Sequence, residues 1–248
     1  LSMDFWDTPT GTLEGDLETE GKRLSSKWSS SLRPWETVAA FLTLPTCASS
    51  VEAEKCLETA HSLSLHFVTA DIDDDVRFFH LGMLPKREHS GLYPVSAFGD
   101  APPWTGRRFG RELPRWVPED GLVATANEEL QFENGNVLST MSQADYRLRR
   151  ILGQLRARND HGFDSMRALQ LDVYSLQAQQ LAPLLLKWLP NGPVRSALSE
   201  WDYCYAADSR GAHAFEVAYD AARRRCFGIE RPFAHTNARK SSAVSPLK

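Results

Sequence analysis

Four aspartates within five positions, Asp71 and Asp73 to Asp75, have the residue type and spacing that could bind a divalent cation. An EF-hand calcium loop requires oxygen ligands at positions 1, 3 and 5, glycine at position 6 and a bidentate glutamate at position 12. Counted from Asp71, the first three positions fit, but position 6 is Val76 and position 12 is Gly82. The sequence therefore excludes an EF-hand here and favours a solvated turn over a dedicated cation site.

The four cysteines are the other candidate metal ligands, at Cys47, Cys56, Cys204 and Cys226. None belongs to a Cys-x-x-Cys pair, so their spacing does not indicate a zinc site. Cys47 and Cys56 could form a local disulfide in an oxidising compartment, and four cysteines are too few to identify that compartment.

The overall composition bounds the classes of function. Of the 248 residues, 42% are hydrophobic and 24% are charged, as in a soluble globular protein. The formal net charge of −4 gives no general attraction to nucleic acid or to an anionic membrane, and short arginine-rich runs are typical of solvated helix faces. The sequence contains no run of 18 apolar residues, and its first residues do not show the pattern of a signal peptide. We therefore expect no nucleic acid and no membrane among its partners.

Two apolar segments flank the aspartates and must position them. Residues 66–70 and 76–80 are rich in β-branched and aromatic side chains, whereas Asp73 to Asp75 are turn formers. This pattern predicts a β-hairpin with an acidic tip. The alternating stretch that ends near Trp28, broken by glycines, predicts short strands before it.

Helices are predicted on both sides of the hairpin. Residues 33–44 and 50–63 carry apolar residues at helical spacing, namely Trp35, Val38, Ala39 and Leu42 in the first and Val51, Ala53, Leu57 and Ala60 in the second. Residues 146–158 form an amphipathic pattern with Leu148, Ile151, Leu152 and Leu155 on one face. A long helix is predicted over residues 163–189, kinked or divided by Pro183. Between them we expect a long loop at 99–121 and a short strand at 121–127.

Three blocks of the sequence, taken in order, resemble the penicillin acylase family of N-terminal-nucleophile amidohydrolases. The first is "FVTADIDDDVRFFHLGMLPKR" (67–87), and the second is "FGRELPRWVPEDGLVATANEE" (109–129). The third combines "YRLRRILGQL" (146–155) and residues 163–189 with "ALSEWDYCYAADSRGAHAFE" (197–216). Each block alone is weakly specific, but their order and spacing from about Asp7 to Tyr219 make the resemblance fairly specific.

The resemblance implies a fold class and a domain organisation. The fold is α+β, as part of the family's four-layer αββα N-terminal-nucleophile hydrolase sandwich with an added helical region. Residues 1–238 are then a partial penicillin acylase-like hydrolase domain. Residues 239–248 form a flexible tail, in keeping with their polar composition.

Two site residues follow from the resemblance. Asn127 matches the family's asparagine whose side-chain amide helps to form the oxyanion hole, and Arg147 matches the arginine that supports this site. A positioned amide donor is worth roughly 10²–10³ in rate when amide cleavage creates a tetrahedral oxyanion. Without the family, Asn127 is read as a cap of the turn before Glu128 and Arg147 as a helix residue whose head group reaches water.

The nucleophile implied by the resemblance is the hydroxyl of an N-terminal serine, activated by its own α-amino group. Here Leu1 precedes Ser2, and Ser2 stands only 69 positions before Asp71, far closer than in the family. We therefore expect the nucleophile to lie outside these residues and the 248-residue chain alone to be inactive. The implied partners are a small-molecule acyl amide, such as a β-lactam or an acyl-homoserine lactone, and a missing upstream or alpha-chain portion of the same precursor.

The family also implies that catalysis needs no cofactor, that a structural calcium is possible, and that the protein is periplasmic or secreted. The hairpin departs from the family pattern, with Asp74 and Arg77 where the family favours glycine and His66 where it favours asparagine. These departures keep open an alternative function, a non-catalytic relative retained as a binding or assembly module. A nucleic-acid binder is disfavoured by the acidic charge balance.

Overall fold

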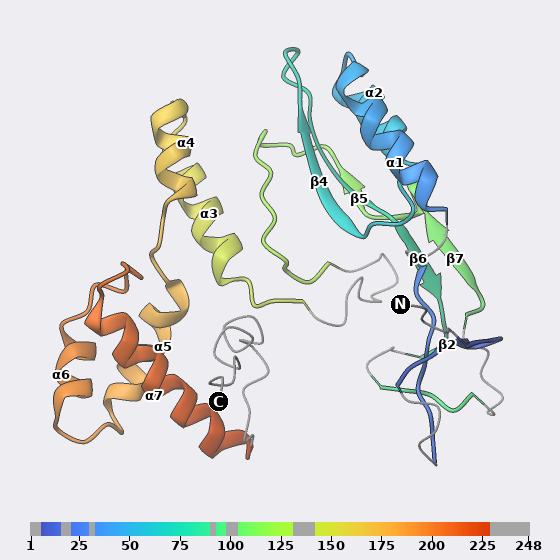
Figure 1. The fold of residues 1–248 in the computed structure, drawn as a ribbon. Helices are drawn as coiled ribbons and strands as arrows, with labels where there is room; N and C mark the ends of the chain where they lie inside the picture. The colour runs from blue at the N-terminus through green and yellow to red at the C-terminus, as the bar shows by residue number, and fades with distance from the viewer. Residues whose placement is uncertain are drawn as a thin grey trace, which may run out of the picture. The chain divides into compact units, whose positions relative to one another are not determined.

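A computed structural model describes residues 6–15, 21–29, 33–89, 93–97, 104–130 and 142–228 (Figure 1). The chain divides into two compact units, Leu1–Leu148 and Arg149–Lys248, which are treated separately below. Helices and small antiparallel sheets both occur, so the α+β class is confirmed. The four-layer sandwich stays a prediction, and the tail at 239–248 lies outside the described residues.

The predicted hairpin is confirmed in the first unit. Strands β4 (Leu65–Ala70) and β5 (Val76–Leu81) pair antiparallel, from Ala70 opposite Val76 beside the turn to Leu65 opposite Leu81 at the far end. At the N-terminal end of the unit, β1 (Asp7–Thr8), β2 (Gly11–Leu13) and β3 (Ser25–Ser26) confirm the predicted short strands.

The acidic tip is a turn that hydrogen-bonds to itself. Asp71 Oδ1 accepts the backbone N–H groups of Asp73 (3.0 Å) and Asp75 (3.1 Å), and Oδ2 accepts that of Ser50 (2.8 Å). These bonds, first of all the one from Ser50, lower the pKa of the Asp71 carboxyl. Asp74 takes a positive φ of 61°, which Asp tolerates better than most residues.

The segment 99–121 is not the long loop that we predicted. Within its described part, β7 (Gly106–Phe109) pairs with β6 (Met83–Lys86), and β8 (Arg115–Trp116) pairs with β5. A 3₁₀ turn, η3 (Gly110–Glu112), lies between β7 and β8 in the chain. The prediction failed because these strands are short and arginine-rich and pair with strands that lie 20 or more residues earlier in the chain. For example, the Trp116 ring stacks on Phe78 with ring centroids 3.8 Å apart.

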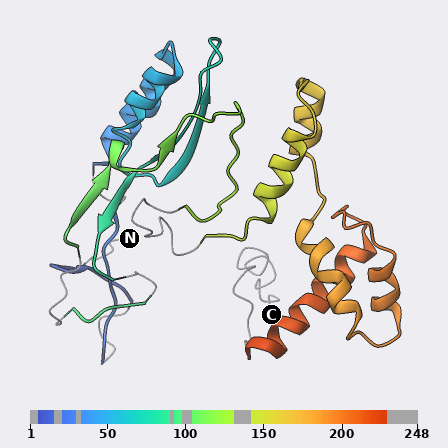
Figure 2. The same cartoon turned by 180° about the vertical axis from the view of Figure 1, so that it is seen from behind.

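Helices α1 (Pro34–Thr43) and α2 (Ser50–Leu57) lie beside the hairpin in both views of the molecule (Figure 1, Figure 2). A 3₁₀ turn, η2 (Leu44–Thr46), follows α1. The buried cluster between these helices and the sheet consists of Ala40, Leu57, Ala60, Phe79 and Leu81. On α2, Glu54 accepts hydrogen bonds from Arg77 of β5 (3.3 Å) and Arg115 of β8 (2.6 Å), so an ion-pair network also holds the helix to the sheet.

The apolar spacing located both helices but did not predict their buried faces equally well. On α1 the buried side chains are Thr37 and Ala40, whereas Trp35, Val38 and Leu42 are exposed. The second helix was predicted to reach residue 63 but ends at Leu57, and its Val51 is exposed. The remaining three residues of that pattern, Ala53, Leu57 and Ala60, are buried.

The second unit is helical. Helix α3 (Tyr146–Arg156), which begins just before the unit boundary, is followed by α4 (Phe163–Gln170), α5 (Leu176–Leu186), α6 (Pro193–Ser199) and α7 (Arg210–Phe227). The predicted face of α3 is confirmed at its buried end, where Leu155 has little exposed surface.

The continuous helix predicted for 163–189 is divided, but not at Pro183, which lies inside α5. The break falls at residues 171–175, where Asp172 Oδ1 accepts the N–H of Tyr174 at 2.9 Å. Ser175 then caps α5 by accepting the N–H of Ala178 at 3.1 Å. An isolated bridge between Tyr174 and Cys204 also holds this break in extended form.

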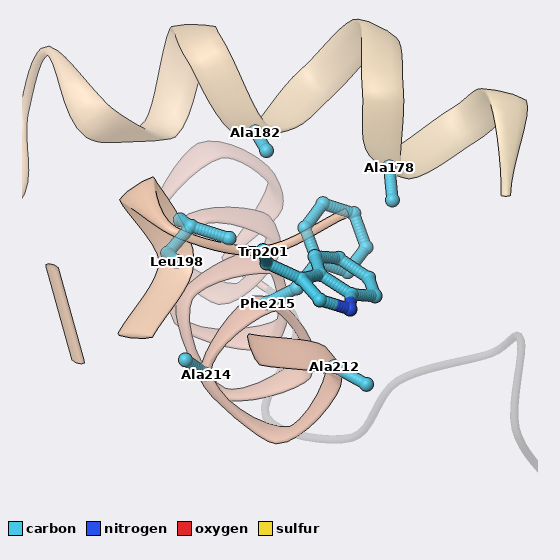
Figure 3. Packing of buried hydrophobic residues seen from close by; sticks show 7 residues of the cluster. All are labelled: Ala178, Ala182, Leu198, Trp201, Ala212, Ala214 and Phe215. Atoms are coloured by element: carbon cyan, nitrogen blue, oxygen red, sulfur yellow. The ribbon is translucent and has the colours of Figure 1, made fainter. Parts of the chain in front are cut away.

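The core of the second unit is built around Trp201. In Figure 3 the Trp201 and Phe215 rings lie together, with Ala178 and Ala182 of α5 pointing toward them. The two ring centroids are 5.7 Å apart, and Leu198, Ala212 and Ala214 complete the buried cluster. Glycine is required at Gly211, because a Cβ there would lie 2.2 Å from Cγ of Trp201.

All four cysteines, including Cys47 and Cys56, are free thiols in this structure. The Cys56 thiol donates a hydrogen bond to the carbonyl oxygen of Ala40 at 3.3 Å.

Across the described ranges, no helix combines the length and the apolar character needed to cross a membrane.

Candidate active site

Asn127 lies in a bend rather than at the end of a strand. Residues 121–127 form no strand, so that prediction is wrong. Local backbone groups there bond to side chains instead of to a neighbouring strand: the N–H of Leu122 donates to Asp120 and that of Ala126 to Glu128. Asn127 takes a φ of 64°, a left-handed conformation in which asparagine is enriched.

Arg147 is the second residue of α3, as predicted, and it reaches back to Asn127. Its Nη1 donates to Asn127 Oδ1 at 3.2 Å and to Gln143 Oε1 at 2.9 Å. The backbone N–H of Gln143 donates to the carbonyl oxygen of Asn127 at 2.7 Å. The structure therefore brings together the two predicted site residues, 20 positions apart in sequence, in a ring of three hydrogen bonds.

This ring fixes the orientation of the Asn127 amide. A guanidinium group has five donors and no acceptor, so only the oxygen of an amide can face it. With Oδ1 directed at Arg147, Nδ2 and its two hydrogens point away from the guanidinium. A neutral, oriented N–H donor is what an oxyanion site requires.

The contacts of Asn127 and Arg147 can be compared with their two alternative roles, a turn cap and a solvated helix residue. The Oδ1 atom of Asn127 accepts from a side chain of α3, and which of its two roles Asn127 has stays a prediction. Arg147 is exposed, as the alternative for it requires, but its head group binds two side-chain oxygens.

Glu128 contributes to the bend and was not singled out in the sequence. One carboxylate oxygen, Oε2, accepts the N–H of Ala126 at 2.6 Å and the hydroxyl of Thr125 at 3.3 Å. The only sequence signal for this role is its position next to Asn127.

A histidine pair in the hairpin is a second polar cluster that sequence reasoning missed. His66 and His80 lie directly opposite in the strand register, with their Nδ1 atoms 3.2 Å apart. His80 Nε2 lies 3.1 Å from the hydroxyl of Ser64. Burial, and then the neighbouring His66, lower the pKa of His80 to about 4, while burial lowers the pKa of His66 against an opposing effect of Glu128. Pairing residue 66 with residue 80 in the predicted hairpin would have placed these two histidines opposite each other.

The described residues contain no cluster of acidic side chains of the kind that binds calcium. Nowhere in ranges 6–15, 21–29, 33–89, 93–97, 104–130 and 142–228 do three or more His, Cys, Asp or Glu side chains gather as ligands. Both oxygens of Asp71, the first of the acidic run, are occupied by backbone N–H groups of its own turn and of Ser50. The structural calcium implied by the resemblance therefore stays a prediction, and no ligand residues are assigned to it.

Comparison with known families gives one match. A family model described as penicillin amidase matches residues 2–246, which includes the acidic hairpin, the Asn127 bend and α3. No curated protein matches the chain.

Proposed function

The chain belongs to the penicillin amidase family, and from this premise we propose that it serves the hydrolysis of a linear acyl amide. In this proposal Asn127 donates a hydrogen bond to the oxyanion and Arg147 orients Asn127. The observation that carries it is the 3.2 Å hydrogen bond from Arg147 Nη1 to Asn127 Oδ1.

The chemistry follows from the charge that develops during attack on an amide. The carbonyl oxygen becomes an oxyanion in the tetrahedral intermediate, and a donor that is already oriented stabilises it without reorganising. Asn127 offers that donor without a charge of its own, while Arg147 holds the opposite end of the amide. The substrate is therefore an acyl amide whose carbonyl oxygen reaches Nδ2 of Asn127.

The family resemblance supplies the remaining parts of the proposal. The attacking group is an N-terminal serine, with its own α-amino group as base, and its chain derives from the same precursor. The protein is periplasmic or secreted. Intact-mass and N-terminal analysis of the purified gene product tests the first part, since a mature chain that begins with serine supports it and the lack of one contradicts it.

Turnover is tested with the full gene product and chromogenic phenylacetyl and long-chain acyl amides. Replacing Asn127 with alanine should lower kcat by roughly 10²–10³ and change KM much less, because the hydrogen bond forms mainly in the transition state. Asn191→Ala, at an exposed loop asparagine, is the matched control and should leave both constants unchanged.

Two outcomes contradict the proposal. A folded gene product that cleaves none of these amides favours the alternative, a non-catalytic binding or assembly module. An active product whose kcat is insensitive to Asn127→Ala removes this residue from the mechanism.

A further inference from the structure

The side chain of Glu128 turns back across the bend that contains Asn127. Its Oε2 atom accepts the N–H of Ala126 at 2.6 Å and the hydroxyl of Thr125 at 3.3 Å. Ala126 is buried, so its N–H has little access to water and depends on this carboxylate. Hydrogen bonds to an ionised acceptor are roughly twice as strong as those between neutral groups.

The backbone of Asn127 needs such support. A φ of 64° is a sparsely populated conformation even for asparagine, and it persists only where the surroundings hold it. Glu128 holds the residues on the N-terminal side, and the N–H of Gln143 holds the carbonyl oxygen of Asn127 at 2.7 Å. Arg147 then fixes the side chain.

We propose that Glu128 is a positioning residue for amide hydrolysis, whose carboxylate holds the Thr125–Ala126 backbone so that Asn127 presents Nδ2 to the oxyanion. This inference rests on the proposed function. Glu128 acts through Asn127, since all its bonds named above go to the bend. Without the carboxylate, the bend relaxes toward a commoner φ and the amide moves from its place beside Arg147.

The first experiment compares two variants of Glu128 in the full gene product. Glu128→Gln keeps an acceptor oxygen at the same reach and should retain kcat within about threefold, because the bonds weaken but survive. Glu128→Ala removes both bonds and should lower kcat by roughly 10- to 100-fold, the effect of a displacement on the order of 1 Å. Glu119→Ala, at an exposed glutamate of the same segment, is the control and should have no effect.

A double-mutant cycle separates positioning from a general structural role. If Glu128 acts through Asn127, Glu128→Ala should have little further effect on kcat in an Asn127→Ala background. Additive losses in the double variant, or equal losses in Glu128→Gln and Glu128→Ala, would overturn the inference.

Amide hydrogen exchange tests the contact without turnover. The Ala126 N–H should be protected in the parent and in Glu128→Gln, and should exchange faster in Glu128→Ala with the hairpin amides unchanged. Faster exchange together with an unaltered kcat would overturn the positioning role while leaving the proposed function intact. A gene product without any turnover would instead overturn the proposed function and, with it, the catalytic part of this inference, whatever the exchange shows.

Discussion

Asn127 and Arg147 have complementary hydrogen-bonding groups. The guanidinium of Arg147 can only donate, so it selects the oxygen of the Asn127 amide and leaves the nitrogen directed elsewhere. Because both side chains are exposed, a hydrogen bond between them contributes little to folding stability. We therefore interpret the contact as one that orients the amide rather than one that stabilises the fold.

His80 is the residue whose ionisation should most affect stability. It is only 4% exposed, and burial lowers its pKa to about 4 from 6.5. The titratable and polar groups that face it or its partner are His66, Ser64 and Glu128. Between pH 6.5 and 4 the unfolded chain binds a proton that the folded chain excludes, so the stabilisation is complete above pH 6.5 and is lost as pH falls.

We predict that the free energy of unfolding falls by about 3 kcal/mol between pH 7 and pH 4 through His80, at about 1.4 kcal/mol per pH unit. Urea midpoints measured across this range check it. His80→Phe should flatten the profile, and His213→Gln, at an exposed histidine of α7, should not. Parallel profiles for the parent and His80→Phe would show that another group carries the pH dependence.

At the scale of elements, β5 continues into β6 through a single residue, Gly82. Its φ is 130°, a conformation that side chains rarely adopt. A Cβ at this position would lie 2.2 Å from the carbonyl oxygen of Leu63, which is backbone and cannot easily move. The direct continuation of β5 into β6 therefore depends on glycine at this junction.

Gly82→Ala should lower the free energy of unfolding by at least about 2 kcal/mol, since it combines backbone strain with a steric clash. Gly153→Ala is the matched control, because Gly153 lies inside α3 and an added Cβ meets nothing within 4 Å. That control should raise helix stability by up to about 1 kcal/mol. Equal effects of the two substitutions in chemical denaturation would contradict the argument.

At the scale of the whole chain, the exposed face of α1 is one apolar surface that should affect its behaviour in solution. Trp35 is 81% exposed and Leu42 is 75% exposed, and Val38 lies between them on the same face. Apolar side chains grouped in this way mark contact surfaces or cause self-association.

The 248-residue chain should therefore self-associate when produced alone, and Leu42→Lys should raise the monomeric fraction measured by size-exclusion chromatography with light scattering. Ile72→Lys is the control, because Ile72 is 96% exposed at the hairpin tip and does not belong to this face. A parent chain that is monodisperse and melts cooperatively as a monomer would contradict this prediction.

Local patterns in the sequence determined the hairpin of residues 65–81 and the start of α3, whereas the family followed from the order of three blocks along most of the chain. They did so because alternation, turn formers and helical spacing act within some ten residues of one another. The family resemblance favours glycine at Asp74 and Arg77, and of these two positions only Asp74 takes a positive φ. The assignments of Asn127 and Arg147 came from motif order, and their roles stay predictions.

Only the tertiary structure decided which segments pair and which faces are buried. The pairing of β8 with β5, the exposure of Trp35 and the break before Ser175 depend on partners far along the chain, and no local window contains their interaction energies. The same holds for the contact between Arg147 and Asn127, since the 20 positions between them can be closed in many ways. Glu128 holds the bend on one side and α3 carries Arg147 on the other. Together they select the chain path in which the guanidinium group meets the amide.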